Sequence, residues 1–313
     1  MSRSIALDFG RAAVAGEVPQ TYTPLLPAAF AWQNFDGQIN LDNTPAVVDP
    51  MSSHVRPLHT RKGLRFAEVS FKEALVRGSA DGSAPPFFDL LAAAGFSIGT
   101  GATADVATLG NMPSNEKALT CELFDGLQKK WAYGVRGLVE ILGEKAGDRI
   151  MVGFNGKGHG DIDDADTYPA GVVESNIKSA IFEGNSLTLG GYTPELRRCS
   201  FKTEQDPVQL TDAIADDGIL EYYHTRTQAF LRVEVYLHTR TAKDWYNSLR
   251  DVADNSHAIN WGIPLGNGLK LSTTGTAMLI KTPNRTDSDG VGVMPLEFQF
   301  DRKSDVVISQ IPE

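Results

Sequence analysis

Apolar and polar residues alternate along several stretches of the chain, a pattern typical of β-strands with one buried face. In residues 67–71, Ala, Val and Phe alternate with Glu and Ser. In residues 229–237, Ala, Leu and Val alternate with residues that include Arg and Glu. Because both patterns have a period of two, we expect both stretches to be strands.

Turn-forming residues indicate further strands. Asp125-Gly126 lies between the stretches 117–124 and 127–133, and this dipeptide is the strongest short-range signal for a β-hairpin. Other expected strands, bounded by similar signals, are 138–142, 149–154, 197–203, 258–263, 269–272, 277–282, 291–301 and 306–311. The sequence therefore predicts a mainly β fold.

Two short helices are expected among these strands. Residues 87–94 follow Pro85-Pro86 and have apolar residues at helical spacing, as do residues 245–252. The Gly-, Thr- and Ala-rich residues 97–111 read as a loop, and the polar, glycine-rich residues 155–171 read as a connection.

The order strand, short helix, several strands occurs twice and predicts two β-sandwich domains, each with one short α-helix. The expected domains cover residues 56–160 and 181–313, with a connection at 161–180. Residues 1–55 contain recurring prolines, which disfavour helices and central strands, so we expect an extended N-terminal arm. The sequence leaves open whether this arm packs on its own chain or on a neighbour.

Composition narrows the class of protein. The 313 residues include 30 glycines, which favours many turns, and 29 Lys+Arg against 39 Asp+Glu give a net charge of −10. Such acidity argues against tight nucleic-acid binding, which needs concentrated cations. Two cysteines are too few for a disulfide framework, and neither a signal segment nor about 18 unbroken apolar residues is present. We therefore expect the protein to be made and matured in a reducing cytoplasm.

The sequence contains no complete motif of the common catalytic and metal-binding sites considered below. The acidic segment with Asp161, Asp163, Asp164 and Asp166 lacks the residue order of a calcium-binding loop. The glycine-rich residues 155–160 precede no helix pattern, which a phosphate-binding loop requires. The six histidines form no HExxH motif, and no GxSxG motif occurs. We therefore predict no enzymatic activity, no cofactor, and no catalytic, cofactor-binding or metal-binding residues.

Several segments together resemble the major tail tube proteins of long-tailed (siphovirus-type) bacteriophages. The resemblance covers the chain from about residue 55 to its end and is one of fold pattern. Its residues are 63–72 (GLRFAEVSFK), Arg77-Gly78-Ser79, Pro85-Pro86, 90–96 (LLAAAGF), Phe124-Asp125-Gly126, 134–137 (GVRG), 147–156, Asp289-Gly290 and 298–301 (FQFD).

The resemblance implies β-sandwich domains that assemble into rings, which stack into a tube for genome delivery and enclose a tape-measure protein. It implies a structural virion protein of the phage tail, whose partners are itself, the tape-measure and other tail proteins, and viral DNA that passes without specific binding; no membrane is expected. An acidic subunit agrees with a channel wall that repels phosphate. Family subunits are often single sandwiches in six-membered rings, so a double subunit predicts a trimer with pseudo-sixfold symmetry, with a hexamer as the alternative. Two other functions stay open: another tail ring component (terminator or baseplate protein), and an intracellular carbohydrate-binding or hydrolytic β-sandwich.

Overall fold

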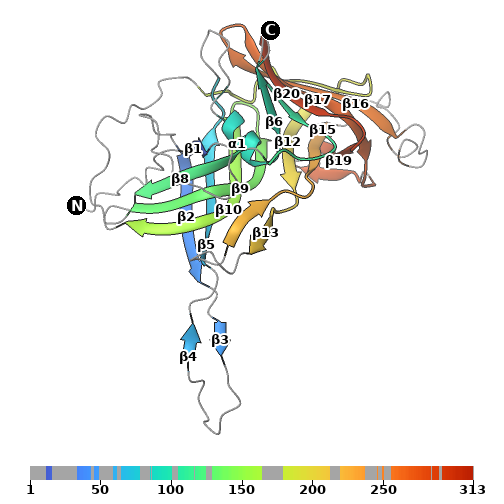
Figure 1. The fold of residues 1–313 in the computed structure, drawn as a ribbon. Coiled ribbons are helices and arrows are strands. Elements are labelled where there is room, and N and C mark those ends of the chain that lie inside the picture. The colour runs from blue at the N-terminus through green and yellow to red at the C-terminus, as the bar shows by residue number, and fades with distance from the viewer. Residues whose placement is uncertain are drawn as a thin grey trace.

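The computed structural model is mainly β, as the sequence predicts (Figure 1). It describes residues 12–15, 34–43, 46–48, 59–61, 65–77, 85, 87–100, 105–115, 117–124, 129–163, 179–211, 219–236, 245, 249, 255–282, 284–288 and 291–312. The helix with described bounds is α1 (Phe88–Ala93). The strands are β1 (Ala12–Ala15), β2 (Asn34–Asn43), β3 (Ala46–Val48), β4 (His59–Arg61), β5 (Arg65–Ala74), β6 (Ser97–Thr100), β7 (Asp105–Leu109), β8 (Ala118–Phe124), β9 (Lys129–Gly143), β10 (Met151–Asp163), β11 (Ser186–Leu189), β12 (Leu196–Glu204), β13 (Val208–Thr211), β14 (Ile219–Tyr223), β15 (Gln228–Tyr236), β16 (Ser256–Gly266), β17 (Leu269–Leu279), β18 (Thr286–Ser288), β19 (Val291–Phe300) and β20 (Val306–Pro312).

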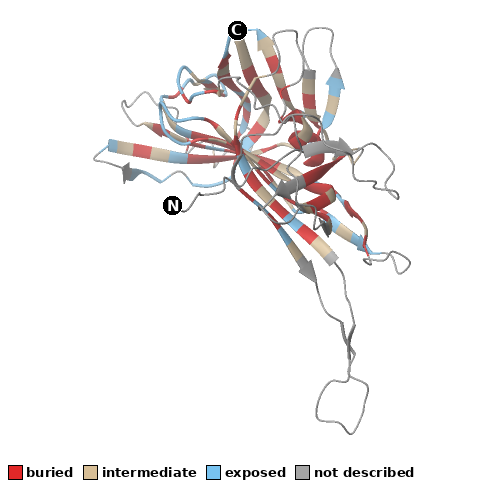
Figure 2. Ribbon diagram, turned by 90° about the vertical axis from the view of Figure 1, so that its left-hand side faces the viewer, coloured by how far each residue is buried: buried red, intermediate tan, exposed pale blue. Residues whose placement is uncertain are grey.

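Sixteen strands form one antiparallel sheet, whose main path runs β2-β5-β10-β9-β12-β15-β19-β17-β20-β7-β6. Strands β1 and β8 continue from β9, and β16 and β11 continue from β17. Strands β13 and β14 form a separate pair, as do β3 and β4, which project away from the rest of the chain (Figure 1). Buried and exposed residues alternate along the strands (Figure 2), as expected where one face of a sheet packs on the core.

Strand β9 has two different neighbours along one of its sides. Its other side pairs with β10 almost throughout, from Leu142 to Lys129. On the divided side, residues 140–143 pair with β12, whereas residues 129–135 pair with β8. The sheet therefore forks at residues 136–139 of β9.

Side chains replace backbone partners where the ladders end. At the fork in β9, the Val139 N–H donates to Thr203 Oγ1 at 2.9 Å, and this hydroxyl donates back to the Val139 carbonyl at 3.4 Å. At the end of β17, Asn255 does the same for Leu279, with an accepted bond of 2.9 Å and a donated bond of 3.0 Å. Both contacts are buried, so neither backbone pair is left without a hydrogen bond.

The sheet joins the two halves of the sequence in two places. One is the pairing of β9 with β12, and the other is the pairing of β7 with the C-terminal strand β20. The core is also continuous, because Phe201 of β12 contacts both Phe96, which precedes β6, and Phe300 of β19, with ring centroids 6.4 and 5.9 Å apart. The predicted boundary near residues 161–180 therefore does not interrupt the sheet.

Part of the segment predicted as an N-terminal arm belongs to this sheet. Strand β2 pairs with β5, and β1 pairs with β8, all on the same chain. Ile39 of β2 is buried in the core. The recurring prolines of this segment lie outside both strands, and β2 is an end of the main sheet path.

Most of the predicted elements are confirmed. The structure contains α1, the strands at 67–71 and 229–236, the hairpin of β8 and β9, and the last strand β20. In the second predicted helix, Trp245 and Leu249 are helical, and its other residues lie outside the described part of the chain.

The prediction of a loop at residues 97–111 is wrong. These residues contain β6 and β7, which pair with each other, and β7 pairs with β20. Local composition favoured a loop, but partners from the far end of the sequence supply the ladder, and such tertiary pairing overrides intrinsic preference.

The prediction of a connection beginning at residue 155 is also wrong, because β10 continues to Asp163. Its glycines mark close contacts between neighbouring strands. A Cβ atom on Gly158 would lie 2.7 Å from the Tyr133 carbonyl oxygen of β9, and one on Gly156 would lie 3.0 Å from the Arg136 carbonyl oxygen of the same strand. Glycine in a strand often has this role, and it explains why the segment reads as a loop in sequence.

Two pairs of predicted strands are single strands. Residues 127–133 and 138–142 were expected to be separate, but β9 contains both from Lys129 on. Gly134 has a φ of 62° next to a shift in register, so the glycine accommodates a bulge rather than a turn. Similarly, β17 contains residues 269–272 and 277–279.

The fork at β9 yields a test. Replacing Thr203 by Val keeps the shape of the side chain but leaves the buried Val139 amide without its acceptor, which costs about 1–3 kcal/mol. We expect urea unfolding to show this decrease in the free energy of unfolding. The control Thr286→Val changes an exposed residue of β18 and should have little effect. Equal stability of the two variants would show that the hydroxyl contributes nothing at the fork.

Candidate functional surface

A charged surface covers the side of the sheet opposite the core. In β12, the buried residues Cys199, Phe201 and Thr203 alternate with Arg198, Ser200, Lys202 and Glu204. In β15, the buried residues Leu231, Val233 and Val235 likewise flank Arg232 and Glu234. We call this surface the charged face. It consists of the side chains of Glu140, Arg198, Lys202, Glu204, Arg232, Glu234, Lys281 and Glu297.

Ion pairs connect these side chains across neighbouring strands. Arg232 lies between two carboxylates, with Nη2 at 2.7 Å from Glu297 Oε1 and at 3.4 Å from Glu204 Oε1. Lys281 also pairs with Glu297, and Lys202 pairs with Glu204. Two further pairs are Arg197 with Glu234 at 2.6 Å and Arg198 with Glu144 at 3.1 Å. The charged face thus has equal numbers of cations and carboxylates, and its charges are largely paired.

Glu297 is the centre of this network. Burial by itself would raise the pKa of its carboxyl group, but hydrogen bonds from Lys281 and Arg232 outweigh this effect and hold the pKa below its ordinary value. The carboxylate is therefore ionised at neutral pH.

The charged face is hollowed into an open groove of about 410 Å³ between β12, β15 and the chain beyond β17. Arg198, Arg232 and Lys281 line it together with Glu140, Glu234 and Glu297. The described residues that line it include no aromatic side chain. Two of its carboxylates, Glu234 and Glu297, are paired with Arg197 and Arg232, respectively. The groove is therefore a polar surface whose charges are largely paired.

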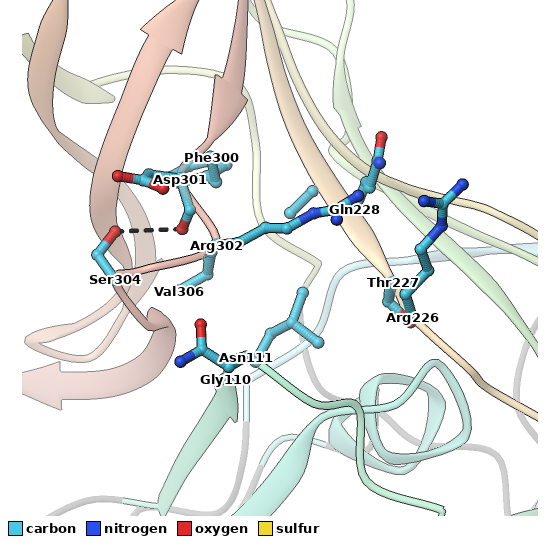
Figure 3. Close-up of a pocket in the computed structure, with 12 residues that line it drawn as sticks. Gly110, Asn111, Arg226, Thr227, Gln228, Phe300, Asp301, Arg302, Ser304 and Val306 are labelled. Atoms are coloured by element: carbon cyan, nitrogen blue, oxygen red, sulfur yellow. Dashed lines mark hydrogen bonds between the residues drawn. The ribbon is translucent and has the colours of Figure 1, made fainter.

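A second, much smaller hollow lies at the corner between β19 and β20 (Figure 3). Its volume is about 50 Å³, room for a few water molecules only. Ser304 Oγ donates to the Asp301 carbonyl at 3.4 Å across the corner, and Arg226 Nε donates to Gln205 Oε1 at 2.6 Å at its rim. This hollow is too small for an organic substrate.

A buried polar network ties the two halves together beside the fork in β9. Arg136 is only 2% exposed, and its guanidinium donates to Asn115 Oδ1 at 2.8 Å, to the Asn115 carbonyl at 2.5 Å and to the Tyr222 carbonyl at 2.9 Å. Glu221 Oε2 lies 3.9 Å away. Because Asn115 precedes β8 and Tyr222 lies in β14, one side chain joins segments distant in sequence.

His224 belongs to the same network. Its N–H donates to Asn115 Oδ1 at 2.8 Å, its carbonyl accepts from Asn115 Nδ2 at 2.9 Å, and its Nε2 is 2.9 Å from the Ala93 carbonyl at the end of α1. Burial, together with the nearby Arg136 charge, lowers the pKa of His224 to about 4, although the hydrogen bond to the Ala93 carbonyl opposes the shift. The imidazole is therefore neutral at pH 7 and serves as a hydrogen-bond donor to α1.

The structure describes only some of the residues considered for chemistry from the sequence. Asp161 and Asp163 lie in β10, whereas Asp164 and Asp166 are outside the described residues. Within the described ranges, no group of three or more His, Cys, Asp or Glu side chains could hold a metal ion. Cys121 and Cys199 are both buried, and burial raises the pKa of Cys199, which disfavours the reactive thiolate.

The charged face was visible in the sequence as the alternation of Arg198, Lys202 and Glu204 with buried residues, although its pairing was not. The network of Arg136 could not be recognised in the sequence, because its partners are backbone carbonyls and an asparagine from other segments.

As for membranes, the described part of the chain contains no helix long and apolar enough to cross one.

A scan against models of known protein families gives no match, and a search of curated protein sequences gives no significant match either.

The buried network predicts a large effect at one arginine. Replacing Arg136 by Gln removes the cation beside the buried Glu221 and leaves carbonyl acceptors without this donor, so we expect a loss of about 3–5 kcal/mol. The matched change Arg198→Gln, at an exposed pair with Glu144, should cost less than about 1 kcal/mol. Urea unfolding of both variants measures the difference, and similar losses would contradict a central role for Arg136.

The charged face predicts a pH dependence. Because the pKa of Glu297 is lowered in the folded protein, its ionisation adds stability above the ordinary carboxyl pKa, and this contribution disappears as the pH falls through the lowered value. Between pH 6 and pH 3 the wild type should therefore lose more free energy of unfolding than Glu297→Gln. Glu144→Gln, at an exposed position, serves as the control. Parallel curves for the wild type and Glu297→Gln would refute the expectation.

Proposed function

We propose that this chain is a structural virion protein, the major tail tube subunit of a long-tailed bacteriophage, without enzymatic activity. In this proposal the chain assembles in the bacterial cytoplasm into stacked rings. The rings enclose the tape-measure protein and later conduct viral DNA, and they contact other tail proteins. The proposal rests on the resemblance of residues 55–313 to tail tube proteins.

One observation supports the proposal most: a single antiparallel sheet runs through both halves, and its strands β12 and β15 carry a polar face opposite the core. A tube wall needs such a surface, because the lining must be polar, continuous and free of deep binding pockets. Each half contributes long adjacent strands to the path, β5, β10 and β9 from the first half and β12, β15 and β19 from the second.

We further propose that the halves act as two tube-like β-sandwich units that share strands at their junction. If each unit occupies one of six positions around the axis, three chains complete a ring. The charged face would then line the channel. Its groove does not favour the carbohydrate-binding alternative, since the described residues that line it include no aromatic side chain.

Electron microscopy of the concentrated, purified protein tests the assembly. We expect rings or tubes with an open channel and three chains per ring. Six chains per ring would replace the trimer by the hexamer, and isolated rings that never stack would favour a terminator or baseplate component. A monodisperse monomer at high concentration, shown by light scattering, would reject the proposal.

Accessibility to labelling tests the position of the charged face. Thr282→Cys places a thiol at the rim of its groove, where the residue is exposed, and Met112→Cys places one on an exposed loop elsewhere. In the assembled protein, Thr282→Cys should react with a small maleimide but poorly with one attached to a large polymer, whereas both reagents should label its dissociated form. Met112→Cys controls for general loss of reactivity. Unchanged reaction of Thr282→Cys with the large reagent after assembly would place the charged face outside the channel.

A further inference from the structure

Strands β13 and β14 form a two-stranded ribbon that is separate from the main sheet and lies at the margin of the body (Figure 1). β14 holds the ribbon to the body, because Tyr222 is buried and its carbonyl accepts a hydrogen bond from Arg136 at 2.9 Å. β13 is the outer strand, and within the described part of the chain it pairs with β14 alone. The other edge of β13 therefore offers backbone N–H and C=O groups to which a further strand could add.

Exposed apolar side chains lie on one face of this ribbon. Val208 of β13 is directly opposite Tyr223 of β14, so the two side chains share a face, and Leu210 lies two positions further along β13. The exposed fractions of Val208, Tyr223 and Leu210 are 45%, 40% and 37%, respectively. A strand added at the edge of β13 would cover part of this apolar surface with its own alternating side chains.

The ribbon is strongly acidic outside its apolar centre. Residues 203–225 contain six Asp and Glu residues and no Lys or Arg. Asp206 is exposed shortly before β13, and Asp212 follows the strand in the sequence, whereas the residues of β13 itself carry no charge. A segment that complements this strand therefore has uncharged residues in its middle and cations at its ends.

These charges decide between the possible partners of β13. If two copies of β13 paired in antiparallel fashion, the acidic residue before one strand would stand beside the acidic residue after the other, and like charges opposite each other destabilise a strand pair. A nucleic acid would bring further negative charge to the same place. An extended segment with Lys or Arg at both ends is attracted instead of repelled.

We propose that the outer edge of β13 binds an extended, basic segment of another protein as an additional strand of the ribbon. The backbone of the partner bonds to the edge of β13, its apolar side chains cover Val208 and Leu210, and its terminal cations pair with the acidic residues on either side of the strand. This inference does not rest on the tail tube proposal, and its test uses the unassembled chain.

Fluorescence anisotropy with labelled synthetic peptides tests the proposal on the full, unassembled chain. The probe is the peptide Lys-Thr-Val-Thr-Val-Thr-Lys, which repeats the spacing of Asp206, Val208, Leu210 and Asp212 with the opposite charge. We expect it to bind, and to slow hydrogen exchange of the amides of β13. The same peptide with Glu in place of Lys should bind roughly tenfold or more weakly. A form with N-methylated backbone amides keeps the charges but cannot donate to the strand edge, so it should not bind.

Two variants locate the site on the protein. Leu210→Lys places a cation on the edge strand, and we expect it to weaken binding of the Lys peptide by roughly tenfold. Asp206→Asn removes one attractive charge at an exposed position and should weaken binding about two- to fivefold. Val291→Lys, at an exposed apolar residue of β19, adds the same charge elsewhere and should bind as the wild type does.

Four results would each overturn the proposal. Absence of binding up to about 1 mM peptide would show that the edge accepts no basic strand. Equal binding of the N-methylated peptide would reduce the effect to charge attraction, and unchanged binding by both Leu210→Lys and Asp206→Asn would place the site elsewhere. Protection of β13 that grows with protein concentration in the absence of peptide would make a second copy the partner. If Leu210→Lys does not fold, Asp206→Asn and the N-methylated peptide still decide the test.

Discussion

The structure depends on the requirement that every backbone group of β9 finds a partner while the strand changes neighbours. On one side of β9, strand β10 supplies the hydrogen-bond partners. On the other side, β12 pairs with residues 140–143 and β8 pairs with residues 129–135, so neither strand pairs with residues 136–139. Thr203 fills this interval by bonding both backbone groups of Val139, and Arg136 gathers the carbonyls of two distant segments beside it. Without these side chains, the fork would leave buried polar groups unpaired, at a cost that few folded proteins can tolerate.

The same requirement explains why the halves cannot be treated as independent. β17 is also divided, pairing with β19 at one end and β20 at the other, and β20 then pairs with β7 from the first half. The two halves are thus hydrogen-bonded to each other through two strand pairs, β9 with β12 and β20 with β7. Pairings between such distant segments must form late and together, because the entropy of closing long loops is lost before the contacts form.

Strand positions could be predicted from the sequence because alternation is a local property, and α1 because its prolines and apolar spacing are local too. The errors at β6 and β7 arise because the partners of their ladders, each other and β20, are not visible in the local sequence. The error at β10 has a different cause. Glycine indicates a turn when read locally, but a Cβ atom on Gly158 would lie 2.7 Å from the Tyr133 carbonyl oxygen of the neighbouring strand β9. Likewise, the alternation of Arg198, Lys202 and Glu204 predicts a polar face, whereas the pairing of Arg232 with Glu297 depends on register, which a single sequence does not specify.

The balanced charges of the charged face bear on how a channel could let DNA pass. The net charge of −10 suggests repulsion, yet this face carries equal numbers of cations and carboxylates, so the excess acidity lies elsewhere on the chain. If the charged face lines the proposed channel, it would avoid binding DNA by a different route. Arg232 and Lys281 are engaged by Glu297, and a phosphate would have to compete with a carboxylate already in hydrogen-bonding contact. A lining with paired cations can therefore be non-adhesive without being strongly negative.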